Sequence, residues 1–162
     1  MTFEPSHSYL IALGSNMRSA RYGAPRKVLA TALELIAFTG VEVTRVSPVI
    51  RSRPVGPSQR EYANAAAVLR CPLTPLALLG MLQGIEHMVG RTRRGQRWRA
   101  RVLDLDIILW SGGVYTADEL TIPHPEFRER DFVLGPAKRI APDWRDPVTG
   151  LTVRQLASRN RA

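Results

Sequence analysis

The sequence has a single cysteine, Cys71, in 162 residues. One cysteine excludes a disulfide framework and any zinc site built from several cysteines. Long hydrophobic runs are also lacking: the longest stretch without a charged residue, Cys71 to Ile85, is fifteen residues, whereas about 20 are needed to cross a bilayer. The first ten residues show no basic segment followed by an apolar run, as a secretory signal would. We therefore expect a soluble, cytoplasmic protein with no membrane partner.

Lysine is scarce, because only Lys27 and Lys138 are lysines among 23 basic residues. Codon bias explains an excess of arginine over the whole chain, but it does not explain clustering. Six arginines fall within residues 91–101, where the chain has no acidic residue. Guanidinium groups suit bidentate contacts to phosphate. With a formal net charge of +9 for the whole chain, this local excess indicates one anionic partner at one place.

Length and composition are those of an ordinary globular domain, with 44% hydrophobic and 23% charged residues. A chain of this size has room for one domain with a substantial core. We found no internal repeat and no linker. We therefore expect residues 1–162 to form a single domain.

Hydrophobic periodicity and turn residues predict six elements and place a further short helix near the end of the chain. In order, these are a strand over 9–13, a helix over 26–38, strands over 41–50 and 62–69, a helix from 75 to about 88, a strand over 102–110 and a short helix near 130–139. The order strand–helix–strand–strand–helix–strand is that of the ferredoxin-like split βαββαβ arrangement. We therefore predict an α+β fold, an antiparallel sheet with helices on one face, plus a C-terminal extension.

The sharpest chemical feature is Asp104-Leu105-Asp106 within the last predicted strand. Residues two apart in a strand share a face, so the two carboxylates lie together and Leu105 faces the other side. Neighbouring carboxylates favour a hard cation such as Mg²⁺, which proteins hold with one or two carboxylates and substrate phosphates. A strand with one face exposed to solvent would also place aspartate at alternating positions, without any function.

The neighbouring arginines favour the metal interpretation. In a protein without ligands, arginines placed directly before two aspartates would only neutralise the carboxylate charges. With Mg²⁺ on the aspartates and a polyphosphate on the metal, every charge has a partner. The glycine-rich lysine loop that cradles phosphates in many nucleotide-binding proteins is missing, since neither lysine lies in such a loop.

Three further residues could contact a ligand. His124 lies between Pro123 and Pro125 in a rigid stretch after a turn, and it is a candidate for a phosphate contact. Tyr62 and Asn64 share a strand face, so an aromatic ring and an amide could recognise a flat heterocycle together. Each of the three could equally be structural.

Taken together, these segments resemble the family of 2-amino-4-hydroxy-6-hydroxymethyldihydropteridine pyrophosphokinases of folate biosynthesis. The resemblance runs from Leu13-Gly14-Ser15-Asn16 to about Pro142. Its most specific part is Arg97 to Ile108, which resembles the family signature of an arginine, two residues, then Asp-x-Asp and aliphatic residues. Supporting matches are 51–57, 62–66, Gln83-x-x-Glu86 with Gly90-Arg91, and 121–125.

The resemblance implies transfer of pyrophosphate from MgATP to 6-hydroxymethyl-7,8-dihydropterin, with release of AMP. It implies two Mg²⁺ ions on Asp104 and Asp106, catalytic roles for these aspartates and for Arg91 and Arg101, and no nucleic-acid or membrane partner. We expect a monomer. The implied ATP-binding residues are Gln83, Glu86, Arg91, Trp98, Arg101, Ile107, Thr121, His124 and Arg130. The implied pterin-binding residues are Ser52, Val55, Tyr62, Asn64 and Phe132.

Two other functions compete with this interpretation. A small RNA-binding module would also have a basic patch and a ferredoxin-like sheet. However, Trp98 is the only aromatic residue among the clustered arginines, whereas proteins that stack on bases use several. A metal-dependent phosphohydrolase would release phosphate from ATP without any pterin.

Overall fold

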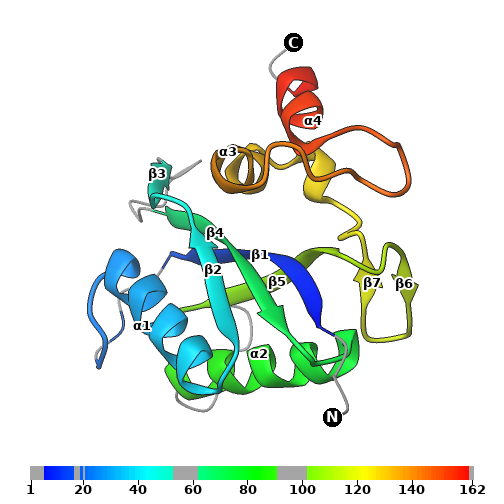
Figure 1. Ribbon diagram of the computed structural model, residues 1–162. Helices are drawn as coiled ribbons and strands as arrows, with labels where there is room; N and C mark the ends of the chain where they lie inside the picture. The colour runs from blue at the N-terminus through cyan, green and yellow to red at the C-terminus, as the bar shows by residue number, and fades with distance from the viewer. Residues whose placement is uncertain (1–5, 17–18, 20, 53–61, 91–101, 161–162) are drawn as a thin grey trace.

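The computed structural model describes residues 6–16, 19, 21–52, 62–90 and 102–160. An antiparallel sheet forms the centre of the described chain, with strand order β2-β4-β1-β5 and with β3 also paired to β4 (Figure 1). The strands are β1 (His7–Ser15), β2 (Glu42–Val46), β3 (Ile50–Ser52), β4 (Tyr62–Cys71) and β5 (Asp104–Trp110).

Two helices connect the strands of this sheet. Helix α1 (Pro25–Phe38) links β1 to β2, and α2 (Pro75–Val89) links β4 to β5. Both lie on the same face of the sheet (Figure 1). Because each helix crosses over one intervening strand, all neighbouring strands are antiparallel, and the predicted ferredoxin-like α+β arrangement is confirmed.

The helix ends follow from local sequence. Pro25 and Pro75 each stand in the first turn, where a missing N–H costs nothing. The Thr74 side chain caps α2 by accepting a hydrogen bond from the Ala77 N–H at 3.4 Å. After α1, Gly40 has a φ of 95°, a left-handed conformation that glycine adopts without steric cost.

The strand predicted over 41–50 is two strands, β2 and β3, separated at Ser47 and Pro48. Pro48 has no N–H to donate to a neighbouring strand. Ser47 bonds to Ala66 of β4 twice: its backbone N–H donates to the Ala66 carbonyl at 2.9 Å, and its hydroxyl accepts from the Ala66 N–H at 2.8 Å. This interruption aligns β3 with the start of β4, where Ser52 pairs with Tyr62.

Strand β4 is longer than predicted, running to Cys71 in spite of its alanines. Ala63, Ala65, Ala66 and Ala67 are all buried, because β4 is a central strand with helices on both faces. Small side chains therefore fit between the sheet and the helices on its two faces. This packing outweighs the low intrinsic strand propensity of alanine.

The C-terminal part of the chain covers the opposite face of the sheet (Figure 1). The prediction of helices on one face was thus incomplete. A two-stranded hairpin of β6 (Tyr115–Thr116) and β7 (Thr121–Ile122) precedes the 3-10 helix η1 (Phe127–Glu129), α3 (Asp131–Ile140) and α4 (Val153–Arg159). Helix α3 confirms the helix predicted near 130–139. Helix α4 was missed, although Thr152 and Gln155 form a capping box at its start.

The alternation of side chains across the sheet therefore produces two cores. Tyr9, Ile11 and Leu13 of β1 face α1 and α2, whereas Leu10 and Ala12 face α3 and α4. Leu103 and Leu105 belong to the first core. Asp104 and Asp106 are half-buried on the opposite side, as the sequence predicted.

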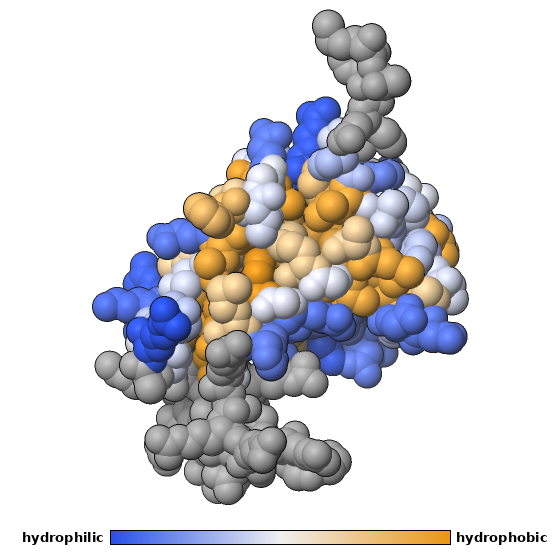
Figure 2. All heavy atoms as spheres, turned by 90° about the horizontal axis from the view of Figure 1, so that it is seen from below, coloured by the Kyte–Doolittle hydropathy of each residue, from blue (hydrophilic) through white to orange (hydrophobic). Residues whose placement is uncertain are grey.

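The lower face of the molecule, over α1 and α2, is rich in apolar side chains (Figure 2). Leu76 and Met88 of α2 and Phe38 of α1 are exposed large apolar side chains. No helix among the described residues is long and apolar enough to span a membrane.

Candidate active site

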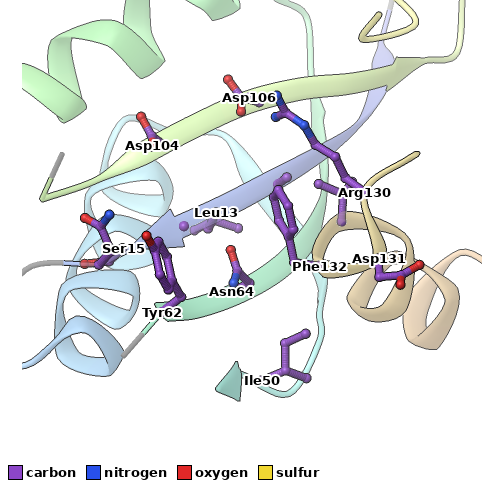
Figure 3. Close-up of a pocket in the computed structure, with 14 residues that line it drawn as sticks. Leu13, Ser15, Ile50, Tyr62, Asn64, Asp104, Asp106, Arg130, Asp131 and Phe132 are labelled. Carbon is purple, nitrogen blue, oxygen red and sulfur yellow. The ribbon is translucent and has the colours of Figure 1, made fainter. Parts of the chain in front are cut away.

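A cavity of about 750 Å³ lies on the face of the sheet opposite α1 and α2 (Figure 3). The adjacent strands β1, β4 and β5 contribute to it, and the start of α3 closes one side. Ala12 and Gly14 form part of its lining, so small residues leave room above the sheet. The other lining residues are Leu13, Ser15, Asn16, Ile50, Tyr62, Asn64, Asp104, Asp106, Arg130, Asp131, Phe132 and Val133.

Strand register determines which side chains meet in this cavity. Gly14 pairs with Asn64 on one side and with Asp104 on the other, and Ala12 pairs with Asp106. Paired residues of adjacent strands point to the same face. The amide of Asn64 and the two carboxylates therefore lie on one surface, on opposite sides of β1.

Asp104 and Asp106 lie next to each other along β5 on the cavity side (Figure 3). Both carboxylates are half-buried and line the cavity. Among the described residues, no group of three or more His, Cys, Asp and Glu side chains is placed to hold a metal ion. The hard oxygen donors of the two aspartates nevertheless suit Mg²⁺, which is commonly held by one or two carboxylates, with phosphate oxygens and water at its remaining coordination positions.

Glu86 supports this pair from the other side of the sheet. Its Oε2 accepts a hydrogen bond from the Leu105 N–H at 2.8 Å. Leu105 separates the two aspartates, so a side chain of α2 fixes the backbone between them. The resemblance implied an ATP contact for Glu86, and the structure shows a bond to the strand that carries the aspartates.

His124 is held in a defined orientation beside the aspartates. Its backbone N–H donates to the Ile108 carbonyl at 3.0 Å, and its Nδ1 accepts from the Glu126 N–H at 3.1 Å. Burial lowers the pKa of His124, and the negative charge of Asp106 opposes this only in part. In the neutral ring Nδ1 is an acceptor, so Nε2 carries the proton and is a donor.

Tyr62 and Phe132 supply exposed aromatic surface to the cavity, on either side of Asn64 (Figure 3). Their exposed fractions are 36% and 42%, whereas Asn64 is 8% exposed. Large aromatic side chains are usually more buried than this, and exposed rings that border a cavity are suited to stacking. A planar ligand bound here would meet the Asn64 amide at one edge and one of the two aromatic rings on each face.

Gly14 keeps the space beside Asn64 open. A Cβ at this position would lie 3.1 Å from Asn64 Oδ1, closer than an ordinary van der Waals contact. A side chain at position 14 would therefore require the Asn64 amide to shift by a few tenths of an ångström.

Arg130 extends along the α3 side of the cavity. Its guanidinium is paired with the Glu126 carboxylate and lies 5.6 Å from the centre of the Phe132 ring. A cation at this distance from an aromatic face is attracted to it. Arg130 is thus adjacent both to the aromatic wall and to the half of the cavity that contains Asp106 (Figure 3).

Several predicted residues lie elsewhere. Gln83 is exposed on α2, Thr121 is exposed in β7, and the Ile107 side chain is buried in the core that faces α1 and α2. Arg91, Trp98, Arg101 and Val55 lie outside the described residues, as does the side chain of Ser52.

Sequence reasoning missed Ser15, Asn16, Ile50 and Asp131, which all line the cavity. Asn16 has a buried Oδ1 without a hydrogen-bond partner among the described residues. A buried acceptor left unpaired is rare and costly, which is typical of a group that pairs with a ligand. The Gly14-Ser15-Asn16 turn at the end of a buried strand was the available signal.

Fold and cavity define a ferredoxin-like α+β protein with a small-molecule site at one end of its sheet. Residues 10–142 match the family model described as 7,8-dihydro-6-hydroxymethylpterin-pyrophosphokinase (HPPK). A Synechocystis protein named 2-amino-4-hydroxy-6-hydroxymethyldihydropteridine pyrophosphokinase is 42% identical over 151 residues, covering 93% of this chain and 74% of its own. A Haemophilus influenzae protein of the same name is 40% identical over 135 residues, covering 82% and 81%.

Solved structures agree on the fold. Plasmodium falciparum HPPK-DHPS with pteroate aligns over 98% of this chain with a TM-score of 0.72 at 12% identity, and this chain spans 43% of that longer one. A second structure, described as HPPK-DHPS in complex with substrates, aligns over 96% of this chain and 45% of its own, with a TM-score of 0.70 at 10% identity. The chain belongs to the HPPK family.

Proposed function

We propose that the protein transfers pyrophosphate from MgATP to 6-hydroxymethyl-7,8-dihydropterin in folate biosynthesis. The observation that carries this proposal is one cavity that holds an aromatic–amide–aromatic set and a pair of carboxylates on opposite sides of β1. Family membership supplies the reaction.

The aromatic half of the cavity binds the pterin. Tyr62 and Phe132 stack on the two faces of the ring, and the Asn64 amide, which has both a donor and an acceptor, pairs with its polar edge. Stacking fixes the ring plane and the amide fixes its rotation in that plane. Together they aim the hydroxymethyl group toward β5, and such positioning is the main contribution of a protein to phosphoryl-type transfer.

The carboxylate half of the cavity binds the nucleotide. Asp104 and Asp106 would hold two Mg²⁺ ions, which when bound neutralise the triphosphate charge and lower the pKa of the attacking hydroxyl group. Nε2 of His124 donates to a phosphate oxygen, and Arg130 adds positive charge beside it. From the resemblance we assign the remaining nucleotide contacts to Arg91, Arg101, Trp98, Gln83, Glu86, Ile107 and Thr121, and backbone contacts to the pterin to Ser52 and Val55.

In the reaction, the hydroxymethyl oxygen attacks the β-phosphorus of ATP. The bond between that phosphorus and the oxygen bridging to the α-phosphorus breaks, and AMP leaves with the bridging oxygen. The hydroxyl proton passes to solvent or to a phosphate oxygen, so no side-chain base is required.

Product analysis by chromatography tests the proposal. Purified protein is mixed with MgATP, with and without 6-hydroxymethyl-7,8-dihydropterin. We expect AMP only when the pterin is present, in equal amount with pterin pyrophosphate. Phosphate release without pterin would instead indicate a hydrolase, and no AMP with pterin would indicate a binding protein.

The proposal includes a single pyrophosphokinase domain over residues 1–162, acting as a cytoplasmic monomer without a nucleic-acid or membrane partner. The continuous sheet, which has one core on each of its faces, supports the single domain. Analytical ultracentrifugation, with and without a single-stranded oligonucleotide, measures both mass and nucleic-acid binding.

A further inference from the structure

The last part of the chain, residues 143–160, lies beyond the family match yet contacts the wall of the cavity. The wall is the segment from η1 to the start of α3, and its residues Arg130, Asp131, Phe132 and Val133 line the cavity. Phe132 and Arg130 are both partly exposed, so packing alone does not fix them. Two polar contacts tie residues 143–160 to this wall.

The first contact is a buried ion pair. Asp146 is fully buried and accepts from Arg128 Nε at 2.6 Å and from Arg128 Nη2 at 2.9 Å. The Val148 N–H and the Thr149 hydroxyl donate to the same carboxylate at 3.0 and 2.7 Å. Burial by itself raises the pKa of Asp146, but these hydrogen bonds outweigh it and lower the pKa to about 2.

Arg128 precedes Arg130 by two residues, so this pair fixes the backbone of the wall directly before its cavity-lining residues. A bidentate arginine–carboxylate pair has a defined geometry, unlike a pair of flexible surface charges. Separating this pair would cost free energy, because it would leave the buried Asp146 carboxylate without a partner for its charge.

The second contact lies at the other end of the segment. Asn160, which follows α4, donates from Nδ2 to Asp131 Oδ1 at 2.6 Å. Asp131 stands between Arg130 and Phe132 and lines the cavity itself. Between the two contacts, Val153, Leu156 and Ala157 of α4 pack in the same core as Val133, Leu134 and Ala137 of α3.

We propose that residues 143–160 position the pterin-stacking wall, with Asp146 on Arg128 and Asn160 on Asp131 as its two anchors. Asp146 and Asn160 are positioning residues, acting through Phe132 and Arg130 without touching substrate. This inference rests on the proposed function, which identifies the ligand as the pterin.

Three single variants test it: Asp146→Asn, Asn160→Ala and the control Asp143→Asn. Asp143 belongs to the same segment, but its side chain is largely exposed and its ion pair, with Arg154 at 3.3 Å, lies within the segment. We expect Asp146→Asn to raise KM for the pterin about tenfold and Asn160→Ala about threefold. The control should stay within about 1.5-fold, and kcat should change less than KM in all three.

A double-mutant cycle separates positioning from general stability. Phe132→Ala removes the ring through which the anchors act. In that background Asn160→Ala should raise KM for the pterin by less than about 1.5-fold, because coupled residues are not additive. Full additivity, or equal effects of Asp143→Asn and Asn160→Ala, would overturn the proposal. Asn160→Ala keeps the test valid even where Asp146→Asn fails to fold.

A binding measurement distinguishes this proposal from the proposed function. The dissociation constant of 6-hydroxymethylpterin is measured by its own fluorescence, in the presence of Mg²⁺ and α,β-methylene-ATP. A wild type that binds the pterin but forms no AMP would contradict the proposed function alone. A wild type that binds no pterin would overturn both.

Discussion

At the scale of single residues, the site depends on a few side chains whose chemistry is set by their strand positions. Asp104 and Asp106 share a face because they are two apart in β5, and Asn64 joins them through its pairing with Gly14. Each of these residues has a distinct partner in the reaction that we propose. Substitutions should therefore separate metal-dependent chemistry from pterin binding.

Replacing Asp106 with alanine should lower kcat by roughly 10³-fold, because it would remove one of the two carboxylates that we propose as metal ligands. Steady-state AMP formation at saturating substrates measures the change. Asp118→Ala is the matched control, since Asp118 is an exposed carboxylate in the β6–β7 turn. A near-normal kcat for Asp106→Ala at ordinary Mg²⁺ concentration would refute the metal assignment.

Tyr62→Ala and Phe132→Ala should each weaken pterin binding by roughly 10- to 100-fold, as expected when one stacking face is removed. The affinity for MgATP should change little, because neither ring belongs to the carboxylate half of the cavity. Calorimetric titration with each ligand compares the two. A comparable loss of affinity for both ligands would show that the rings are structural.

Gly14→Ala should raise KM for the pterin roughly tenfold, since the added Cβ would lie 3.1 Å from Asn64 Oδ1. The fold should tolerate the change, because alanine is compatible with a strand. Gly84→Ala, on the exposed face of α2, is the control for activity. An unchanged KM for Gly14→Ala would mean that the Asn64 amide is not a pterin contact.

At the scale of elements, the sequence predicted the helix starts and strand faces that depend on residues close together in the chain. Helices α1 and α2 begin at Pro25 and Pro75, and the Thr74 side chain caps α2. The Asp-x-Asp strand was predicted with its two faces correctly assigned. The division of 41–50 was missed because it depends on the bond between Ser47 and Ala66, a contact made across strands. Strand β4 was underestimated because the packing on both its faces favours alanine.

The candidate site was predictable to a similar degree. The carboxylates, Tyr62 and Asn64 are recognisable from strand periodicity, and His124 from its two prolines. Asp131 and Ile50 could not be assigned, because they reach the cavity only through the packing of α3 and the pairing of β3. The bond from Glu86 to Leu105 likewise requires the docking of α2 beneath β5.

Helix α2 contains two exposed glycines, Gly80 and Gly84, and a Cβ added at either one would meet no described atom within 4 Å. Replacing either with alanine should stabilise the protein by about 1 kcal/mol, because glycine is a poor helix former. The corresponding rise in Tm is roughly 2–4 °C for a chain of this size. Thermal unfolding followed by circular dichroism measures it, and a lower Tm would indicate that the helix needs these glycines for packing.

At the scale of the whole molecule, the sheet joins two cores, and residues far apart in sequence make one cavity. The acid stability of this assembly should depend on Asp146. Its pKa is about 2 in the folded chain and 3.8 ordinarily, so its contribution is complete above pH 3.8 and is lost as pH falls toward 2. The difference corresponds to about 2 kcal/mol.

Urea unfolding of wild type and Asp146→Asn between pH 2 and pH 6 measures this contribution. The wild type should be more stable than the variant above about pH 4, and the two curves should converge as pH falls toward 2. Asp143→Asn is again the control, because its exposed ion pair contributes little. A constant difference between wild type and Asp146→Asn over this range would contradict a carboxylate held in its charged form.

The pairing of Gly14 with both Asn64 and Asp104 has a consequence for which alcohols can react. Neighbouring strands are about 4.8 Å apart, so the backbones that carry Asn64 and Asp104 are separated by about 10 Å across β1. A sheet cannot stretch to alter this spacing. In the reaction that we propose, this fixed spacing would select the acceptor by the length of the arm that carries its hydroxyl group. A longer or shorter arm would place the oxygen at the wrong distance from the phosphorus, even with the ring bound in the same position.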